Sequence, residues 1–189
     1  RRLGPTPKSS NDMLAILLEG KIETLLATHP SVERGQVEKI CESLSTLRPR
    51  VPVDVVAKMA EVSESAVSSF VSDLGRPLLN VGGAVQFVDE PAEGWFRKRF
   101  KPTQQEFQAY YFRLKQFAKH SAYVSTCLPQ LALEAGLFDE LVKLGLATEV
   151  EWSSSEIEKK EIALARQTFA LKACLRRRKW YEASKLSFL

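Results

Sequence analysis

The sequence predicts a mainly α-helical protein, in which a winged-helix unit with a small β-hairpin is followed by TPR-like helical hairpins. Three observations support this fold class. Apolar residues recur at helical spacing along most of the chain. Two short β-prone segments flank a Gly-Gly pair near the middle. A segment near the C-terminal end repeats the pattern of one that lies 42 residues earlier, from Phe138 to Trp180.

The composition is that of an ordinary globular protein, with 44% hydrophobic and 26% charged residues among 189. No apolar run reaches the roughly 18 residues that cross a bilayer, and the first residues lack the apolar core of a signal peptide. The three cysteines, Cys41, Cys127 and Cys174, are far apart in apolar helical patterns, which favours buried thiols in a reducing compartment. We therefore expect a cytoplasmic protein with no membrane partner.

The first third of the chain predicts four helices in succession. Leucines at helical spacing indicate a helix over residues 10–28, and Ser31 can cap a second helix whose apolar stripe runs to Leu47. Pro52 suits the first turn of a short third helix. A fourth helix is capped by Ser63, covers residues 63–74 and ends at Gly75, because glycine accepts a positive φ without penalty.

The next stretch changes its period from helix to strand. Residues 78–81 and 84–88 are β-prone and flank Gly82-Gly83, which predicts a tight hairpin. A winged helix has this order of elements, with helices followed by such a hairpin. The expected core of this unit is Phe70, Leu74 and Phe87. The predicted domains are an N-terminal helix and linker over 1–30, a winged-helix-like domain over 31–90, and truncated TPR-like repeats over 91–189.

The remainder of the chain predicts helices only. Trp95, Phe96 and Phe100 give a short amphipathic segment that we expect to bridge the winged helix and the repeats. Thr103 and Glu106 form a capping box at the start of the next helix. Segments 122–135 and 138–147 then form a pair, and the polar residues 153–156 open a long helix.

An internal echo suggests helical repeats. Residues 138–144 align with residues 180–186, and each segment follows a predicted helix. The repeat signature is Phe138 and Leu141 in the first copy, and Trp180 and Ala183 in the second. Repeats of this kind stack, and each buries the apolar face of its neighbour.

No catalytic, cofactor-binding or metal-binding residue is predicted. A GxxxxGK[ST] phosphate loop is absent, and Gly82-Gly83 lies between strands and is too short to surround a phosphate. His29 and His120 have no second His or Cys at metal-ligand spacing, and no Ser-His-Asp or Cys-His set can be assembled. We expect a non-enzymatic segment with no cofactor.

The residues of the fourth predicted helix indicate whether this unit is suited to bind DNA. A winged helix that reads DNA needs cations on this helix, since phosphate contacts dominate affinity. Its outward residues carry none, and they are Glu64, Ser65, Ser68, Ser69, Ser72 and Asp73. The hairpin is uncharged. Nucleic acid is therefore not the expected partner, although Arg48, Arg50, Lys58 and Arg76 leave open a DNA-binding transcriptional regulator with a helical partner-binding domain.

Two basic clusters account for much of the net charge of +4. The first is Arg97-Lys98-Arg99 with Lys101, and the second is Arg176-Arg177-Arg178-Lys179. Either cluster could contact nucleic acid or an acidic partner, or it could be a solvated helix face.

Several segments resemble parts of large bacterial STAND-type (NACHT/NB-ARC-like) NTPases. Residues 70–78, 85–91 and 95–96 look like the segment that follows the nucleotide-binding domain of that family. Residues 123–124, 128–131 and 135–141 are similar to the start of its TPR-like sensor array. The resemblance covers roughly residues 31–189. The phosphate loop and acidic metal-binding motif of the family have no counterpart here, so no ATPase residue is carried over.

The resemblance implies a regulatory role. In that family the winged helix packs on the NTPase core, the repeats recognise a trigger, oligomerisation activates an effector, and several members act in antiviral defence. The chain has no initiator Met and ends within an apolar run, so we expect a fragment of a longer protein. Its expected partners are the NTPase domain of the same protein and an unknown trigger. A scaffold protein with generic repeats and no nucleotide-binding domain remains a further alternative.

Overall fold

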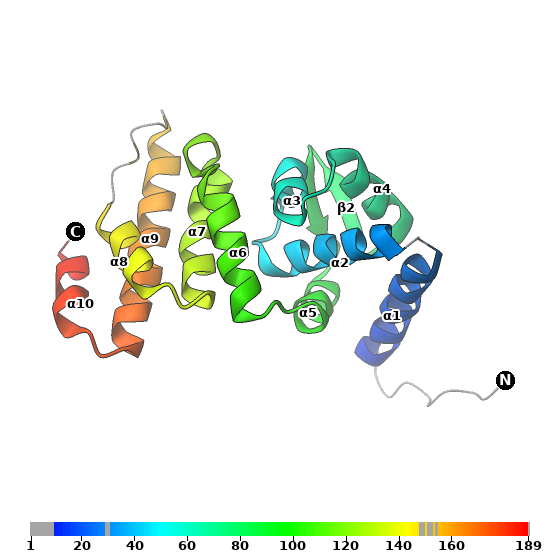
Figure 1. Ribbon diagram of the computed structural model, residues 1–189, viewed down its shortest axis with the longest axis horizontal. Coiled ribbons are helices and arrows are strands. Elements are labelled where there is room, and N and C mark those ends of the chain that lie inside the picture. The colour runs from blue at the N-terminus through cyan, green and yellow to red at the C-terminus, as the bar shows by residue number, and fades with distance from the viewer. Residues whose placement is uncertain (1–9, 29–30, 148–149, 151–152, 154, 189) are drawn as a thin grey trace. The chain divides into compact units, whose positions relative to one another are not determined.

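The computed structural model of the protein describes residues 10–28, 31–147, 150, 153 and 155–188 (Figure 1). These residues are mainly helical, as the sequence predicts, and include a small three-stranded antiparallel sheet that contains the predicted hairpin. The chain divides into two compact units, Arg1–Lys101 and Pro102–Leu189. The first unit extends beyond the expected boundary at residue 90, because the helix after the hairpin packs on an earlier helix of that unit.

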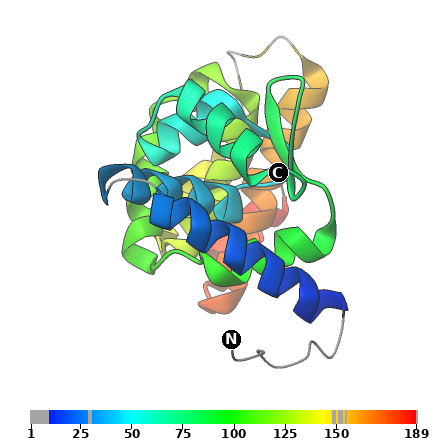
Figure 2. The ribbon, with the colours of Figure 1, turned by 90° about the vertical axis from the view of Figure 1, so that its right-hand side faces the viewer.

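The first unit consists of helices, some of which pack against a small sheet. Its described elements are α1 (Ser10–Thr28), α2 (Ser31–Thr46), β1 (Val51–Pro52), α3 (Val53–Ala60), α4 (Glu64–Leu74), β2 (Leu78–Val81), β3 (Ala84–Phe87) and α5 (Glu90–Arg99). Figure 2 shows α1 on the near face of this unit and the β2–β3 hairpin to one side. The helices bury Leu18, Ile22, Leu44, Met59 and Leu74, each no more than 1% exposed.

The sheet has the strand order β1-β3-β2. Gly82 and Gly83 have φ values of 61° and 76°, which a two-residue turn of this type requires at both positions. β1 was not predicted, and Pro52 was expected to begin the third helix. Val51 pairs with Val85, and the amide of Val53 donates to the Gly83 carbonyl at 2.9 Å. Two residues are too few for an alternating pattern, so only the pairing with the hairpin defines this strand.

Side chains at helix ends confirm most of the predicted caps. The Ser63 hydroxyl accepts a hydrogen bond from the Ala66 amide, and Gly75 ends α4 with a φ of 69°. Thr103 and Glu106 form the predicted capping box. The side chain of Ser31 lies outside the described residues. Asp89, which was not singled out, caps α5 by accepting from the Ala92 amide at 2.8 Å.

The second unit is an array of helices that lie side by side (Figure 1). Its described elements are α6 (Gln104–Lys115), the short 3-10 helix η1 (Ala118–His120), α7 (Ala122–Glu134), α8 (Phe138–Leu146), α9 (Glu156–Arg176) and α10 (Trp180–Ser187). α7 packs against both α6 and α9, and α9 also packs against α8 and α10. The core includes Tyr111, Leu114, Leu141, Ile162 and Cys174, each fully buried.

The turns between α7 and α8 and between α9 and α10 have the same backbone hydrogen bonds. The Leu137 amide donates to the Ala132 carbonyl at 2.9 Å, and the Lys179 amide donates to the Cys174 carbonyl at 2.9 Å. A second pair of bonds, Gly136 to Leu133 and Arg178 to Leu175, repeats at the same offset. The echo in the sequence therefore corresponds to two helical hairpins whose turns have matching geometry.

Candidate protein-interaction surfaces

The residues predicted for the core of the first unit are buried to different degrees. Phe70 and Leu74 lie on the inner face of α4 and are 5% and 0% exposed. Phe87, at the end of β3, is only half-buried, and its ring lies 5.1 Å from that of Phe96. β1 pairs only with Ala84 and Val85, so Phe87 lies beyond the end of that pairing and is covered by α5 rather than enclosed.

The aromatic residues of α5 pack on one another within the first unit. The Phe96 ring lies 5.2 Å from Trp95 and 5.6 Å from Phe100. Phe96 and Phe100 are buried, whereas Trp95 is half-buried. This cluster joins α5 to the hairpin, and the hydroxyl of Ser45 in α2 donates to the Phe100 carbonyl at 2.7 Å.

The signature residues of the two hairpins differ in exposure. Leu141 and Ala183 are 0% and 6% exposed and face the interiors of their hairpins. Phe138 is half-buried, while Trp180, its counterpart, is 62% exposed. The first hairpin is covered by α9, and no helix among the described residues covers the second in the same way.

The outward face of α4 is free of positive charge. Glu64, Ser65, Ser68, Ser69, Ser72 and Asp73 are all exposed, as the helical period predicts. Of the cations near this face, Lys58 pairs with Asp54 at 2.8 Å and Arg50 donates to Gln86 at 3.2 Å. The helix therefore presents hydroxyls and carboxylates to solvent.

An apolar hollow of about 220 Å³ lies beside that face of α4. Its lining comes from three helices and includes Leu25, Val37, Ile40, Ala66, Phe70 and Asp73. A second and more open hollow of about 400 Å³ lies between α1 and α4, and Leu25 and Asp73 line both. The two hollows adjoin at these residues, and we call them together the α1–α4 groove.

Exposed apolar side chains border the α1–α4 groove. Met13, Ile16 and Leu17 on α1 are 54%, 55% and 60% exposed, and the last two line the groove. α1 is held at the groove by Lys21, whose ammonium donates to the Leu74 carbonyl at the end of α4 at 2.9 Å. An apolar helix face beside an apolar groove is a common feature of protein contact sites.

The two basic clusters differ in their partners. Arg97 donates to the Ser45 and Leu47 carbonyls at 2.9 Å each and pairs with Glu93 at 2.7 Å. Arg99 pairs with Glu19 at 3.1 Å. In the second cluster only Arg177 has partners among the described residues, since its guanidinium lies 4.9 Å from the Phe138 ring and donates to the Gly136 carbonyl.

A hollow of about 170 Å³ lies next to the second cluster. It is bounded by the turns of both hairpins, and its lining includes Leu133, Gly136, Phe138, Leu141, Arg176 and Arg177. We call it the turn hollow. Apolar side chains and two arginines line it together, which is an arrangement suited to a ligand with apolar and anionic parts.

A polar cluster connects α6 and α8 in the second unit. Glu140 accepts hydrogen bonds from Lys115 and from the Tyr111 hydroxyl, the latter at 3.2 Å, and it lies 3.7 Å from the Lys143 ammonium. The bond from Lys115 holds the pKa of Glu140 below its usual value. Burial and the adjacent carboxylate raise the pKa of Tyr111. These groups satisfy one another, so the cluster is an inter-helix tie.

The cysteines behave as packing residues. Cys41, Cys127 and Cys174 are all free and buried. Burial raises the pKa of the thiols of Cys41 and Cys174, which disfavours the thiolate that a nucleophile requires. Within the described residues no group of three His, Cys, Asp or Glu side chains could hold a metal ion.

Sequence patterns alone did not reveal the α1–α4 groove or the turn hollow, because each is formed by helices that are distant in sequence. A partial signal existed for the turn hollow, since the 42-residue offset aligns Arg178 with Gly136 and puts the basic run at a hairpin turn.

Comparison with known proteins does not identify the chain, since neither a protein-family model nor a curated protein sequence matches it. In the part of the chain that the structure describes, no helix combines the length and apolar character that a membrane crossing requires.

Proposed function

We propose that this chain is a non-catalytic, protein-binding regulatory segment of a larger signalling ATPase, linking the nucleotide-binding core to a repeat sensor. The observation that carries the proposal is the outer face of α4. It presents serines and carboxylates to solvent and lies beside the apolar α1–α4 groove. Such a surface suits contact with another protein domain better than contact with phosphates.

The proposal interprets the first unit as a winged helix. A short strand between the second and third helices pairs with the hairpin, which gives the strand order β1-β3-β2. This pairing supports a winged helix, because it ties the wing to the start of the helix-turn-helix pair α3–α4.

The proposal interprets the second unit as TPR-like repeats. The matching hydrogen bonds of the two hairpin turns support repetition at an offset of 42 residues. The helix contacts support stacking, since α9 packs against both members of the preceding hairpin. In stacked arrays of this type the repeats supply an extended surface for a protein partner.

The rest of the proposal follows from the resemblance to STAND-type NTPases. The first unit would pack on the nucleotide-binding domain of the same protein, and the repeats would bind a trigger, with oligomerisation of the whole protein as the response. The setting would be the bacterial cytoplasm, with antiviral defence as one role. The segment itself would bind no cofactor.

The contact with the nucleotide-binding domain can be measured directly. We expect calorimetry to detect binding of this chain to the domain encoded upstream of Arg1, with the α1–α4 groove as the contact surface. Leu17→Ser should weaken binding by roughly tenfold, because it removes an apolar side chain that is 60% exposed at the groove. Leu79→Ser on β2, where the side chain is 44% exposed, is the matched control and should change nothing.

Two outcomes would remove this function. An upstream coding sequence without a GxxxxGK[ST] phosphate loop would eliminate the ATPase part of the proposal. Equal weakening by Leu17→Ser and Leu79→Ser would show that the α1–α4 groove is not the contact surface.

A further inference from the structure

The turn between α9 and α10 carries an unusual residue in a left-handed conformation. Arg178 has a φ of 55°, and the equivalent residue in the preceding hairpin is Gly136, with a φ of 71°. A non-glycine residue in this region costs of the order of 1 kcal/mol relative to glycine. The second hairpin thus keeps a strained arginine where the first has an unstrained glycine.

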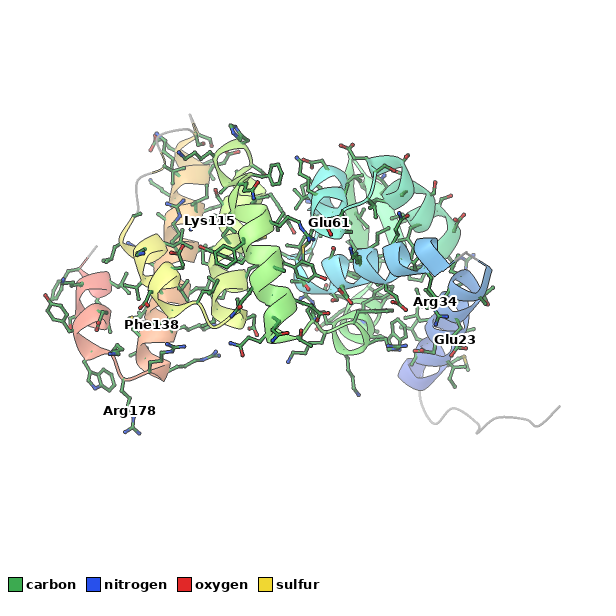
Figure 3. The ribbon with its side chains drawn as sticks, in the orientation of Figure 1. Glu23, Arg34, Glu61, Lys115, Phe138 and Arg178 are labelled. Carbon is green, nitrogen blue, oxygen red and sulfur yellow. The ribbon has the colours of Figure 1, made fainter. Side chains whose placement is uncertain are left out.

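The other strained residues in the described part of the chain have partners that account for their side chains. Glu61, with a φ of 59°, forms an ion pair with Lys39 at 3.1 Å. Arg50, with a φ of 64°, donates a hydrogen bond to Gln86. Arg178 makes no such contact with the described residues, and its side chain extends from the end of the unit (Figure 3). Its charge is therefore available to a partner.

Three cations lie together at this turn. Arg176, Arg178 and Lys179 are exposed, and none of them forms an ion pair within the described residues. Arg176 also lines the turn hollow. This cluster contrasts with the first basic cluster, in which Arg97 and Arg99 are engaged by carbonyls and carboxylates of their own unit.

The turn hollow supplies an apolar site beside these charges. Leu133, Phe138 and Leu141 contribute to its lining, and Arg177 stacks on the Phe138 ring and so holds one wall in place. Its volume of about 170 Å³ is on the scale of one aliphatic side chain. An apolar residue seated here would bring the adjoining chain to the cations.

We propose that the α9–α10 turn and the turn hollow bind an acidic peptide segment, with one apolar side chain in the hollow and neighbouring carboxylates on Arg176, Arg178 and Lys179. The proposal rests on the proposed role of the helical hairpins in binding proteins and names the partner class. Glu134 and Asp139 lie at the other hairpin turn. Because these two carboxylates would repel an acidic ligand, we expect the carboxylates of the ligand only on the side of its apolar residue that faces the α9–α10 turn. A nucleic acid would contact the cations but would leave the apolar lining of the turn hollow unoccupied.

The test uses synthetic peptides and the whole chain. Fluorescence anisotropy is measured with a labelled peptide in which a leucine adjoins a run of glutamates, and with peptides that replace the glutamates by glutamines or lysines. A single-stranded oligonucleotide of equal charge is measured in parallel. We expect the glutamate peptide to bind more tightly than the other peptides and the oligonucleotide, and its affinity to fall with added salt because the ion pairs are exposed.

Substitutions at the turn localise the binding. Each of Arg176→Ser, Arg178→Gly and Lys179→Ser should weaken the glutamate peptide by roughly twofold to fivefold, and their combination by more than roughly tenfold. Arg178→Gly should not lower the melting temperature, because the relief of left-handed strain offsets the greater freedom of glycine in the unfolded chain. Lys98→Ser, an exposed lysine of the first basic cluster, is the control and should leave affinity unchanged.

Three results would overturn the inference: equal binding of the glutamate and glutamine peptides, unchanged affinity in the triple variant, or tighter binding of the oligonucleotide. None of them bears on the Leu17 experiment, which concerns the other unit, so a failure here is distinguishable from a failure of the proposed function.

Discussion

Gly145 lies where α8, α9 and α10 meet, and the packing there leaves no room for a side chain. A Cβ atom at this position would come within 2.5 Å of the Ala170 Cβ and 2.8 Å of Leu186 Cδ2. These distances are shorter than real carbon contacts, so neighbouring atoms would have to move. The absence of a side chain at Gly145 is thus a requirement for packing the first hairpin against the second.

Gly145→Ala should therefore destabilise the protein by about 1–2 kcal/mol, since overpacking exceeds the gain in helix propensity. Thermal and urea unfolding measure this change. Gly94→Ala is the matched control, because Gly94 also lies in a helix but has nothing within 4 Å of its Cβ position. That variant should be neutral or slightly more stable. Equal stability of the two variants would contradict the packing argument.

Arg97 and Lys98 are neighbours in the first basic cluster with different structural roles. Arg97 donates to two carbonyls at the end of α2, whereas Lys98 is exposed. We expect Arg97→Ala to cost about 1–3 kcal/mol, because hydrogen bonds from a charged donor are lost and Ser45 is buried. Lys98→Ala should change stability by less than about 0.5 kcal/mol. Urea unfolding of both variants measures these changes in stability. Similar losses of stability in the two variants would show that Arg97 and Lys98 do not differ in structural role.

At the scale of elements, Glu140 ties α8 to α6 through Lys115 and Tyr111. Its pKa is lowered in the folded protein, chiefly by the hydrogen bond from Lys115. A lowered pKa means that the folded state favours the carboxylate. The resulting stabilisation is present above the unfolded pKa of about 4.3 and is lost as the pH falls through the folded value.

Glu140→Gln should therefore flatten the acid end of the stability profile. Melting temperatures between about pH 3 and pH 7 measure the effect. The wild-type protein should lose more stability than the variant as the pH falls below about 4.5, while the two curves should run parallel above about pH 6. Asp139→Asn, at an exposed neighbouring carboxylate, is the control. Parallel curves over the whole range for Glu140→Gln would rule out this tie.

The elements themselves were largely predictable, because local patterns define them. Ser63, Gly75 and the Thr103–Glu106 box mark helix ends that the structure confirms. β1 was missed, since a two-residue strand exists only through its partner in the hairpin. The half-buried positions of Phe87 and Trp95 were equally hidden, because burial depends on which helix covers a ring. The α1–α4 groove depends on tertiary packing and has no local signal, and the internal repeat is the one partial signal for the turn hollow.

At the scale of the whole molecule, the chain consists of two compact units with different surfaces. The first presents an apolar groove beside a helix face that lacks cations. The second presents cations that have no ion pair among the described residues, beside a small apolar hollow. The first surface combines apolar area with hydroxyls and carboxylates, and the second combines apolar area with positive charge. We therefore propose protein partners for both surfaces.

The most direct test of this account is the affinity of the whole chain for duplex DNA, measured over a series of salt concentrations. We predict binding no tighter than the micromolar, nonspecific range, and no effect of Ser69→Glu on the outer face of α4. Any weak binding should instead disappear with the Arg176, Arg178 and Lys179 substitutions. Submicromolar affinity that falls steeply with salt and is abolished by Ser69→Glu would contradict the account and establish α4 as a DNA-reading helix.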